Sequence, residues 1–229
     1  RPEIAGDKTT LSGLFHPEVQ SYLHSQSKQF QPIDIEISCA PLLITGANMS
    51  GKTVILKSIA LAQTLLQFGF YVPARHASLM LMDEIMLSMG EQGRGEDGLS
   101  SFATEILLID RMVKTVKKNV KIMALVDELA RTTNPEEGKR IVKAFLEIMQ
   151  AHNTPAIVTT HYAGIGTSVR RLRIKGLNIV DSEKITPATL NDHIDYSLVE
   201  VTQDDVPEEA LRIAEILGVE EELVRKARK

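Results

Sequence analysis

The stretch "LLITGANMSGKTVILK", from Leu42 to Lys57, constrains the fold of this chain more than any other. Gly46, Gly51, Lys52 and Thr53 satisfy the pattern Gly-x-x-x-x-Gly-Lys-Thr, between a predicted strand and a predicted helix. In such a turn the backbone N–H groups converge on phosphate oxygens, and the N-terminus of the following helix adds positive potential. The stretch therefore predicts a loop that binds a nucleotide's phosphates, in preference to a plain strand-to-helix turn with an exposed lysine.

The middle of the chain alternates apolar runs of strand length with longer helical patterns. The runs are "APLLIT", "SLMLMDEIML", "KIMALVDE" and "PAIVTT", and the helical patterns cover residues 54–68, 100–118 and 136–150. Strands that are apolar throughout and separated by helices are typical of a mostly parallel sheet covered on both faces. The predicted fold class is therefore α/β.

Two of these helices have clear signals, and the end of the chain has its own pattern. Asn134 is an N-cap residue, Pro135 fits the first helical position, and Glu136 and Glu137 place negative charge on the first turn. The last 24 or so residues predict two short helices separated at Gly218. The helix over residues 100–118 has one apolar face, made of Phe102, Ile106, Ile109, Val113 and Val116.

Composition and charge narrow the class of protein. With 43% hydrophobic and 24% charged residues the chain is typical of a soluble globular protein, and its net charge of −4 argues against a surface that clamps nucleic acid broadly. The one dense basic stretch, Arg170 to Lys175, is predicted to be the solvent face of an edge strand. The single cysteine, Cys39, excludes an intrachain disulfide, and no apolar run approaches the about 18 residues of a membrane span. These features predict a cytoplasmic protein without a membrane segment, and the first residue, Arg1, suggests a piece of a longer chain.

Hydrolysis of a nucleotide requires carboxylates beside the phosphate loop, and two acidic pairs compete for this role. Asp83 and Glu84 end one apolar run, and Asp127 and Glu128 end another. The second pair is better placed, because it leads into a capped helix and then into a strand followed by His161. The first pair is then predicted to be the acidic end of a structural strand. A histidine at a strand end is either a sensor of the γ-phosphate or a structural residue, and both interpretations of His161 stay open.

Several segments follow one another in a fixed order: "TGANMSGKT" (45–53), "FGFYVPA" (68–74), "GLSSF" (98–102), "VDELARTTNPEEG" (126–138) and "VTTHY" (158–162). Together they resemble the ATPase domain of the MutS superfamily, over roughly Leu11 to the C-terminus. The wording "GKTVILK" and "PEEG" looks closer to the MutS paralogues that often carry a small nuclease tail than to the mismatch-repair enzyme itself. Where mismatch-repair relatives have Gly-Arg-Gly-Thr after the acidic pair, this chain has "LARTT".

The resemblance implies a P-loop ATPase of ABC type with the cofactors ATP and Mg²⁺. Thr53 and Asp127 would hold magnesium, Glu128 would activate water, and His161 would sense the γ-phosphate. Nucleotide contacts are expected from Gly46, Asn48, Met49, Ser50, Gly51, Lys52, Thr53 and Phe30.

Two of these assignments have structural alternatives. "FQPIDI" matches a family segment whose aromatic residue stacks on adenine, so Phe30 is either that residue or a core phenylalanine at a strand edge. In ABC-type ATPases two copies complete each other's sites, and Ser100 would be the signature serine that faces the partner's γ-phosphate. A plain N-cap is the alternative for Ser100.

The resemblance divides the chain into an N-terminal segment (1–40) leading into the nucleotide site, a P-loop ATPase core (41–182), and a C-terminal connection with a helical dimerisation element (183–229). A homodimer, or a heterodimer with a related chain, is implied, with DNA bound through domains outside this segment. The preferred function is the ATPase of a dimeric clamp in DNA mismatch repair or related DNA processing. The alternatives are a MutS-related ATPase that remodels a protein client, such as a cobalamin-dependent aminomutase, and, more distantly, a small-molecule kinase.

Overall fold

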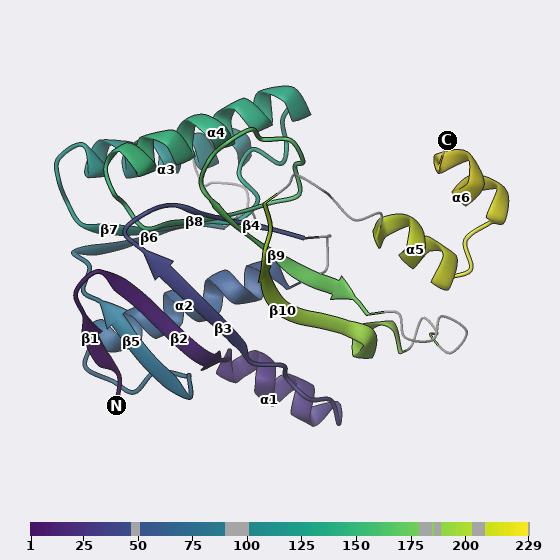
Figure 1. Cartoon of the computed structure of the whole chain (residues 1–229), viewed down its shortest axis with the longest axis horizontal. Helices are drawn as coiled ribbons and strands as arrows, with labels where there is room; N and C mark the ends of the chain where they lie inside the picture. The colour runs from purple at the N-terminus through teal and green to yellow at the C-terminus, as the bar shows by residue number, and fades with distance from the viewer. Residues whose placement is uncertain (47–50, 90–100, 179–184, 186–188, 203–208, 229) are drawn as a thin grey trace.

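The computed structural model describes residues 1–46, 51–89, 101–178, 185, 189–202 and 209–228. Its larger sheet has six strands in the order β10-β9-β4-β8-β7-β6 (Figure 1). All neighbours in this sheet pair in parallel except β10, which runs antiparallel to β9, so the predicted mostly parallel sheet is confirmed. The strands are β4 (Leu42–Thr45), β6 (Glu84–Ser88), β7 (Ile122–Val126), β8 (Ala156–Thr160), β9 (Arg170–Leu177) and β10 (Ile194–Glu200).

Both faces of the central part of this sheet are covered by helices, which explains why β4, β7 and β8 are buried along most of their length. α2 (Lys52–Gln67) lies on one face, and α3 (Ser101–Val116) and α4 (Pro135–Ala151) lie on the other (Figure 1). Alternate residues of each strand enter opposite cores: in β4, Leu42 and Ile44 pack with α2, whereas Leu43 packs in the cluster that contains α3 and α4. In a strand buried on both faces, a polar side chain at any position costs free energy unless it finds a hydrogen-bond partner.

A second sheet of four strands, in the order β1-β5-β2-β3, covers the other side of α2. It consists of β1 (Glu3–Ala5), β2 (Lys8–Leu14), β3 (Ile33–Ser38) and β5 (His76–Met80), with α1 (Pro17–Ser25) between β2 and β3. In β3 the isoleucines are buried and the polar residues between them are exposed, as expected for a sheet with one face in the core. The first 40 residues, predicted only as a segment leading into the nucleotide site, therefore contribute three strands and a helix.

One predicted strand is in fact two. The run "SLMLMDEIML" contains the end of β5 and most of β6, which belong to different sheets. Asp83 lies in the turn between them, where its carboxylate accepts a hydrogen bond from the Lys121 N–H at 2.8 Å, and Glu84 begins β6. The prediction that this acidic pair ends a strand is wrong, because Asp83 precedes β6 and Glu84 begins it.

The basic stretch in β9 was predicted to lie on an edge strand, and this is also wrong. β9 pairs with β4 on one side and with β10 on the other. Arg171 is accordingly buried, while Arg170 is exposed and donates to the Glu200 carboxylate of β10. The second neighbour, β10, lies within residues 183–229, which were predicted as a C-terminal connection and helical element, so nothing in the local sequence of β9 indicated it.

The predicted helix boundaries are confirmed at two places. Asn134 caps α4 by accepting a hydrogen bond from the Glu136 N–H at 2.9 Å. The chain ends in α5 (Glu209–Ile216) and α6 (Glu221–Ala227), joined by an ion pair of 2.9 Å between Arg228 and Glu215. A short 3-10 helix, η2 (Leu190–His193), precedes β10. Within the described ranges, none of the helices has both the length and the apolar content that crossing a membrane requires.

Candidate nucleotide site

The carboxyl ends of β4, β7 and β8 meet at one edge of the larger sheet, and the predicted site residues follow them directly. Gly46 follows β4, Asp127 and Glu128 follow β7, and His161 follows β8. Ligands of open α/β sheets bind at this edge, where the strand order reverses. The other acidic pair, Asp83 and Glu84, lies at the opposite edge, which removes it from the site.

The start of α2 places Lys52 at the centre of this edge. The side chain of Lys52 is only 4% exposed, and its ammonium donates a hydrogen bond to the Gly46 carbonyl oxygen at 2.8 Å. Gly51 has a φ of +84°, and a Cβ added there would lie 3.2 Å from the Tyr196 ring. Glycine is therefore required at this position both for its backbone conformation and for the close approach of the tyrosine.

Asp127 is held by hydroxyl groups on both of its carboxylate oxygens. Thr53 donates to Oδ2 at 2.6 Å, and Thr159 of β8 donates to Oδ1 at 2.7 Å. The Thr159 oxygen also accepts a hydrogen bond from the Glu128 N–H at 2.9 Å, so one threonine fixes both members of the acidic pair. Asp127 is 8% exposed. Its contact with Thr53 brings together, next to the phosphate loop, two oxygen atoms of the kind that hard metal ions prefer as ligands.

This donor set fits magnesium and does not resemble an all-protein metal cage. No group of three or more His, Cys, Asp or Glu side chains that could hold a metal ion occurs in the part of the chain that the structure describes. Mg²⁺ is usually bound through one or two protein oxygens, with phosphate oxygens and waters completing its shell. The Thr53 hydroxyl and the Asp127 carboxylate, 2.6 Å apart, offer two such oxygens.

Glu128 lies among cationic side chains and has an unusual backbone conformation. Its Oε1 is 3.3 Å from the Lys52 ammonium, and its Oε2 is 3.3 Å from the Arg131 guanidinium. The side chain is 13% exposed, and its φ of +51° is rare for a residue with a Cβ. Such strained residues cluster at functional sites, where the surrounding contacts hold them in place.

His161 is the last group around Glu128. Its Nδ1 is 3.9 Å from Glu128 Oε2, too far for a hydrogen bond, and it has no hydrogen-bond partner among the described residues. Burial lowers the pKa of His161 below its ordinary value, and the opposing effect of Glu128 does not overcome this. A neutral imidazole whose buried nitrogen has no partner among the described residues could bond to a ligand, and the sensor interpretation of His161 stays a prediction.

The loop after Glu128 is fixed from two directions. Ala130 has a φ of +61°; its N–H donates to the Glu105 carboxylate of α3 at 3.2 Å, and its carbonyl accepts from the Tyr162 hydroxyl at 2.7 Å. Burial raises the pKa of Glu105 above its ordinary value. Through these contacts the loop that carries Glu128 is connected to the helix that follows the predicted signature segment. Ser100 itself lies outside the described residues.

A cavity of 660 Å³ adjoins the phosphate loop. Its walls come from α1, from the segment before β3, from the first two turns of α2 and from residues 192–196, and they are mostly apolar. Phe30 and Tyr196 both line it, and Gly51 joins it to the phosphate loop. Burial raises the pKa of Tyr196, so its phenol stays neutral. The cavity has the size and character of a site for an aromatic ligand group.

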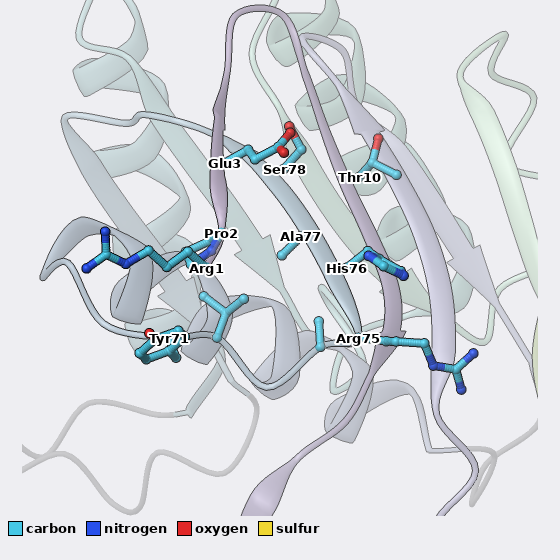
Figure 2. Close-up of a pocket in the computed structure, with 11 residues that line it drawn as sticks. Arg1, Pro2, Glu3, Thr10, Tyr71, Arg75, His76, Ala77 and Ser78 are labelled. Atoms are coloured by element: carbon cyan, nitrogen blue, oxygen red, sulfur yellow. The ribbon is translucent and has the colours of Figure 1, made fainter.

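A smaller pocket of 330 Å³ lies on the four-stranded sheet (Figure 2). It is lined by β1, β2 and β5 and by the segment after α2, including Tyr71 and Arg75. It shares no residue with the larger cavity or with the acidic pair. Arg1 and Arg75 point away from each other in Figure 2, so they do not form a joint anion site there.

The structure thus brings several of the predicted site residues together at one edge of the larger sheet. Lys52, Thr53, Asp127, Glu128 and His161 form one cluster, and Phe30 lines the adjoining cavity. Asn48, Met49 and Ser50 lie outside the described residues. Sequence reasoning missed three residues. Thr159 and Arg131 were within quoted motifs without a role, and Tyr196 lies in no motif at all.

Comparison with known proteins gives a consistent result. The family described as MutS domain V matches residues 42–229. The chain is similar to the endonuclease MutS2 of Lactobacillus helveticus, with 30% identity over 81% of this chain and 23% of the relative. It is also similar to the DNA mismatch repair protein MutS of Thermus aquaticus, with 31% identity over 80% of this chain and 22% of the relative. The chain therefore spans less than a quarter of the length of these two relatives.

Proposed function

The chain belongs to the MutS superfamily, in which its residues 42–229 form domain V, and we propose that it is the ATP-binding and ATP-hydrolysing part of a MutS-like protein that acts in DNA mismatch repair or related DNA processing. The observation that carries the proposal is the contact network of Lys52, Thr53, Asp127 and Glu128 at the carboxyl edge of the sheet. These residue types, in these positions, are what phosphoryl transfer to water requires.

The proposed binding mode assigns the phosphates to the phosphate-loop motif and Lys52, and the base to the adjoining cavity. Lys52 pairs with the β- and γ-phosphates, and the backbone N–H groups of the loop between Gly46 and Gly51 cradle them. Adenine occupies the 660 Å³ cavity, where Phe30 and Tyr196 supply aromatic faces. The cavity is mostly apolar, so it suits a base and would exclude the triphosphate.

The proposed hydrolysis depends on Glu128 as general base. Its carboxylate takes a proton from the attacking water, whose oxygen bonds to the γ-phosphorus as the bond to the β–γ bridging oxygen breaks, giving ADP and phosphate. Thr53 and Asp127 would hold magnesium, which, when bound, would neutralise charge on the phosphate oxygens. Thr159 accepts a hydrogen bond from the Glu128 N–H and so holds its backbone, and His161, beside Glu128, would contact the γ-phosphate.

We further propose the ABC-type arrangement, in which two copies face each other, Ser100 completes the partner's site, and residues 183–229 contribute to the dimer. What supports it is the connection from α3 through Glu105 to the Glu128 loop, because it links the predicted trans contact to the catalytic group. DNA would be contacted by parts of the protein outside this segment, whose own net charge is −4. From the sequences of the motifs "GKTVILK" and "PEEG" alone, we propose a closer relationship to the MutS paralogues that often carry a small nuclease tail.

The roles of Lys52 and Glu128 are tested by a pair of variants with a matched control. Lys52→Ala should abolish ATP binding measured by calorimetry, because it removes the cation nearest the phosphates. Glu128→Gln should bind ATP and lose about 100-fold or more in hydrolysis rate. Glu84→Gln, the same change at the opposite edge of the sheet, should behave like the unaltered protein. Retained ATP affinity in Lys52→Ala would refute the phosphate-loop assignment.

The DNA-processing role is tested by measuring ATP hydrolysis by the full-length protein with duplex, mismatched and branched DNA at low salt. Stimulation or inhibition by one of these DNAs is the expected result. The relatives reported above carry DNA-processing names and give no support to the alternative of a protein client. Intact hydrolysis that is indifferent to every DNA would nevertheless contradict the proposed role and return attention to that alternative.

A further inference from the structure

β10 contains a β-bulge at the wall of the cavity. Asp195 pairs with Gly176 of β9 and Leu198 pairs with Ile174, so two residues of β10, Tyr196 and Ser197, lie opposite one residue of β9. A bulge takes backbone groups out of the ladder and turns a side chain in a new direction. Here Tyr196 is one of the two residues in the bulge; it lines the cavity, and a Cβ added at Gly51 would lie 3.2 Å from its ring.

One side chain from a distant part of the chain, that of Gln31, bonds to every residue of the bulged segment. The Gln31 Oε1 accepts a hydrogen bond from the Tyr196 N–H at 3.0 Å. Its Nε2 donates to Asp195 Oδ1 at 2.9 Å and to Ser197 Oγ at 3.1 Å. All three residues of the bulged segment therefore bond to the amide of Gln31, which is the residue directly after Phe30.

Asp195 completes this arrangement from the side of β10. Its Oδ1 also accepts from the Ser197 N–H at 2.9 Å, and its Oδ2 forms an ion pair of 3.2 Å with Lys175 of β9. The Ser197 hydroxyl, with a further contribution from the Gln31 amide, holds the pKa of Asp195 well below its ordinary value. The Asp195 carboxylate is thus ionised, and both of its oxygens have partners. These contacts hold the bulged segment in one conformation.

We infer that Gln31 is a positioning residue for the nucleotide base: by bonding the bulge of β10 it holds Tyr196 in the wall of the cavity together with its own neighbour, Phe30. The inference rests on the proposed function, since it concerns the base site of the same nucleotide. Both amide donors of Gln31 are used within the protein, so it acts through the two aromatic walls rather than by reading the base edge.

The test separates the base from the phosphates. Gln31→Leu keeps a side chain of similar size and removes the amide, and the matched control is Gln150→Leu, at an exposed glutamine in the last turn of α4. Affinities of the full-length protein for ATP and for inorganic tripolyphosphate, which has no base, are measured for each variant. Gln31→Leu should bind ATP roughly three- to tenfold more weakly and tripolyphosphate as the unaltered protein does, because only base stacking is disturbed. The retained tripolyphosphate binding also shows that the variant is folded.

A double-mutant cycle checks that the effect runs through the bulge. Asp195→Ala should lower ATP affinity in the same base-dependent way, and Gln31→Leu should add little in that background, because both substitutions disrupt one network. Three outcomes would each overturn the inference and leave the proposed function standing. They are an unchanged ATP affinity in Gln31→Leu, an equal loss of affinity for ATP and for tripolyphosphate, and full additivity of Gln31→Leu with Asp195→Ala. An unaltered protein that binds neither ligand would overturn the proposed function and this inference with it.

Discussion

Gly138 offers a test of how the Glu128 loop is supported. The residue lies in the first turn of α4, and a Cβ placed there would be 2.7 Å from the Cζ and 2.8 Å from the Cε2 of Tyr162. Real Cβ atoms do not approach other atoms so closely, so Gly138→Ala must push the tyrosine ring away. Tyr162 is 7% exposed and its hydroxyl bonds to the Ala130 carbonyl, which leaves the ring little room to move without breaking that bond.

The expected change in the free energy of unfolding is the sum of two destabilising contributions and one stabilising contribution. Overpacking a filled core costs about 1 to 3 kcal/mol, and loss of the buried tyrosine hydrogen bond costs about 1 kcal/mol more. Alanine stabilises a helix interior by about 1 kcal/mol relative to glycine. The net expectation is a destabilisation of about 1 to 3 kcal/mol, which for a chain of this size lowers the melting temperature by about 2 to 12 °C.

The assay is thermal unfolding followed by circular dichroism, together with the ATP hydrolysis rate. The control is Gly6→Ala, because Gly6 has no atom within 4 Å of an added Cβ, and its melting temperature should be unchanged. Gly138→Ala should also hydrolyse ATP more slowly, since Tyr162 supports the loop that carries Glu128. A Gly138→Ala protein as stable as the unaltered one would refute the reasoning, because it would show that Tyr162 is not confined by the helix.

Three further predictions concern the acidic pair and its neighbours. Asp127→Asn should remove the gain in ATP affinity that magnesium gives, measured by titrations with magnesium and with a chelator. His161 has a pKa lowered by burial, so it contributes stability that is fully present above its ordinary pKa of about 6.5 and is lost as the pH falls below it. His161→Gln should therefore flatten the fall in melting temperature below about pH 6.5, and an unchanged slope would contradict this. Glu105→Gln should lower kcat with little change in KM, since Glu105 supports the Ala130 N–H of the catalytic loop without touching nucleotide; a change confined to KM would count against that role.

The parts of the fold that could be predicted are those whose pattern has a local cause. Continuous apolar runs indicated a sheet buried on both faces, and the cap at Asn134 fixed the start of α4. The break between β5 and β6 could not be seen, because residues 81–83 contain neither glycine nor proline and the turn is held by a contact from Asp83 to distant Lys121. The alternation of isoleucines in β3 was present in the sequence and would have indicated its strand.

The same distinction holds for the candidate site. Lys52, Thr53 and the acidic pair follow strand ends at known spacings, so their meeting at one edge could be expected from a parallel sheet. The walls of the cavity could not be predicted in this way. Gln31 and Tyr196 are 165 residues apart in the sequence, and they meet only because β10 folds back beside β3. Long-range pairing of this kind has no periodic signal in one sequence.

The contact between Lys52 and Glu128 links the two halves of the proposed mechanism. Both side chains are nearly buried, at 4% and 13% exposure, and removing one partner of a buried ion pair is costly unless another charge replaces it. Under the proposed roles, the γ-phosphate is that replacement, because it would take the Lys52 ammonium that Glu128 otherwise holds. The Glu128 oxygen that faces Lys52, Oε1, would then be available to water only when the nucleotide is in place, while Oε2 stays beside Arg131. A single lysine can in this way make activation of the base depend on substrate binding, without any movement of the sheet that carries both residues.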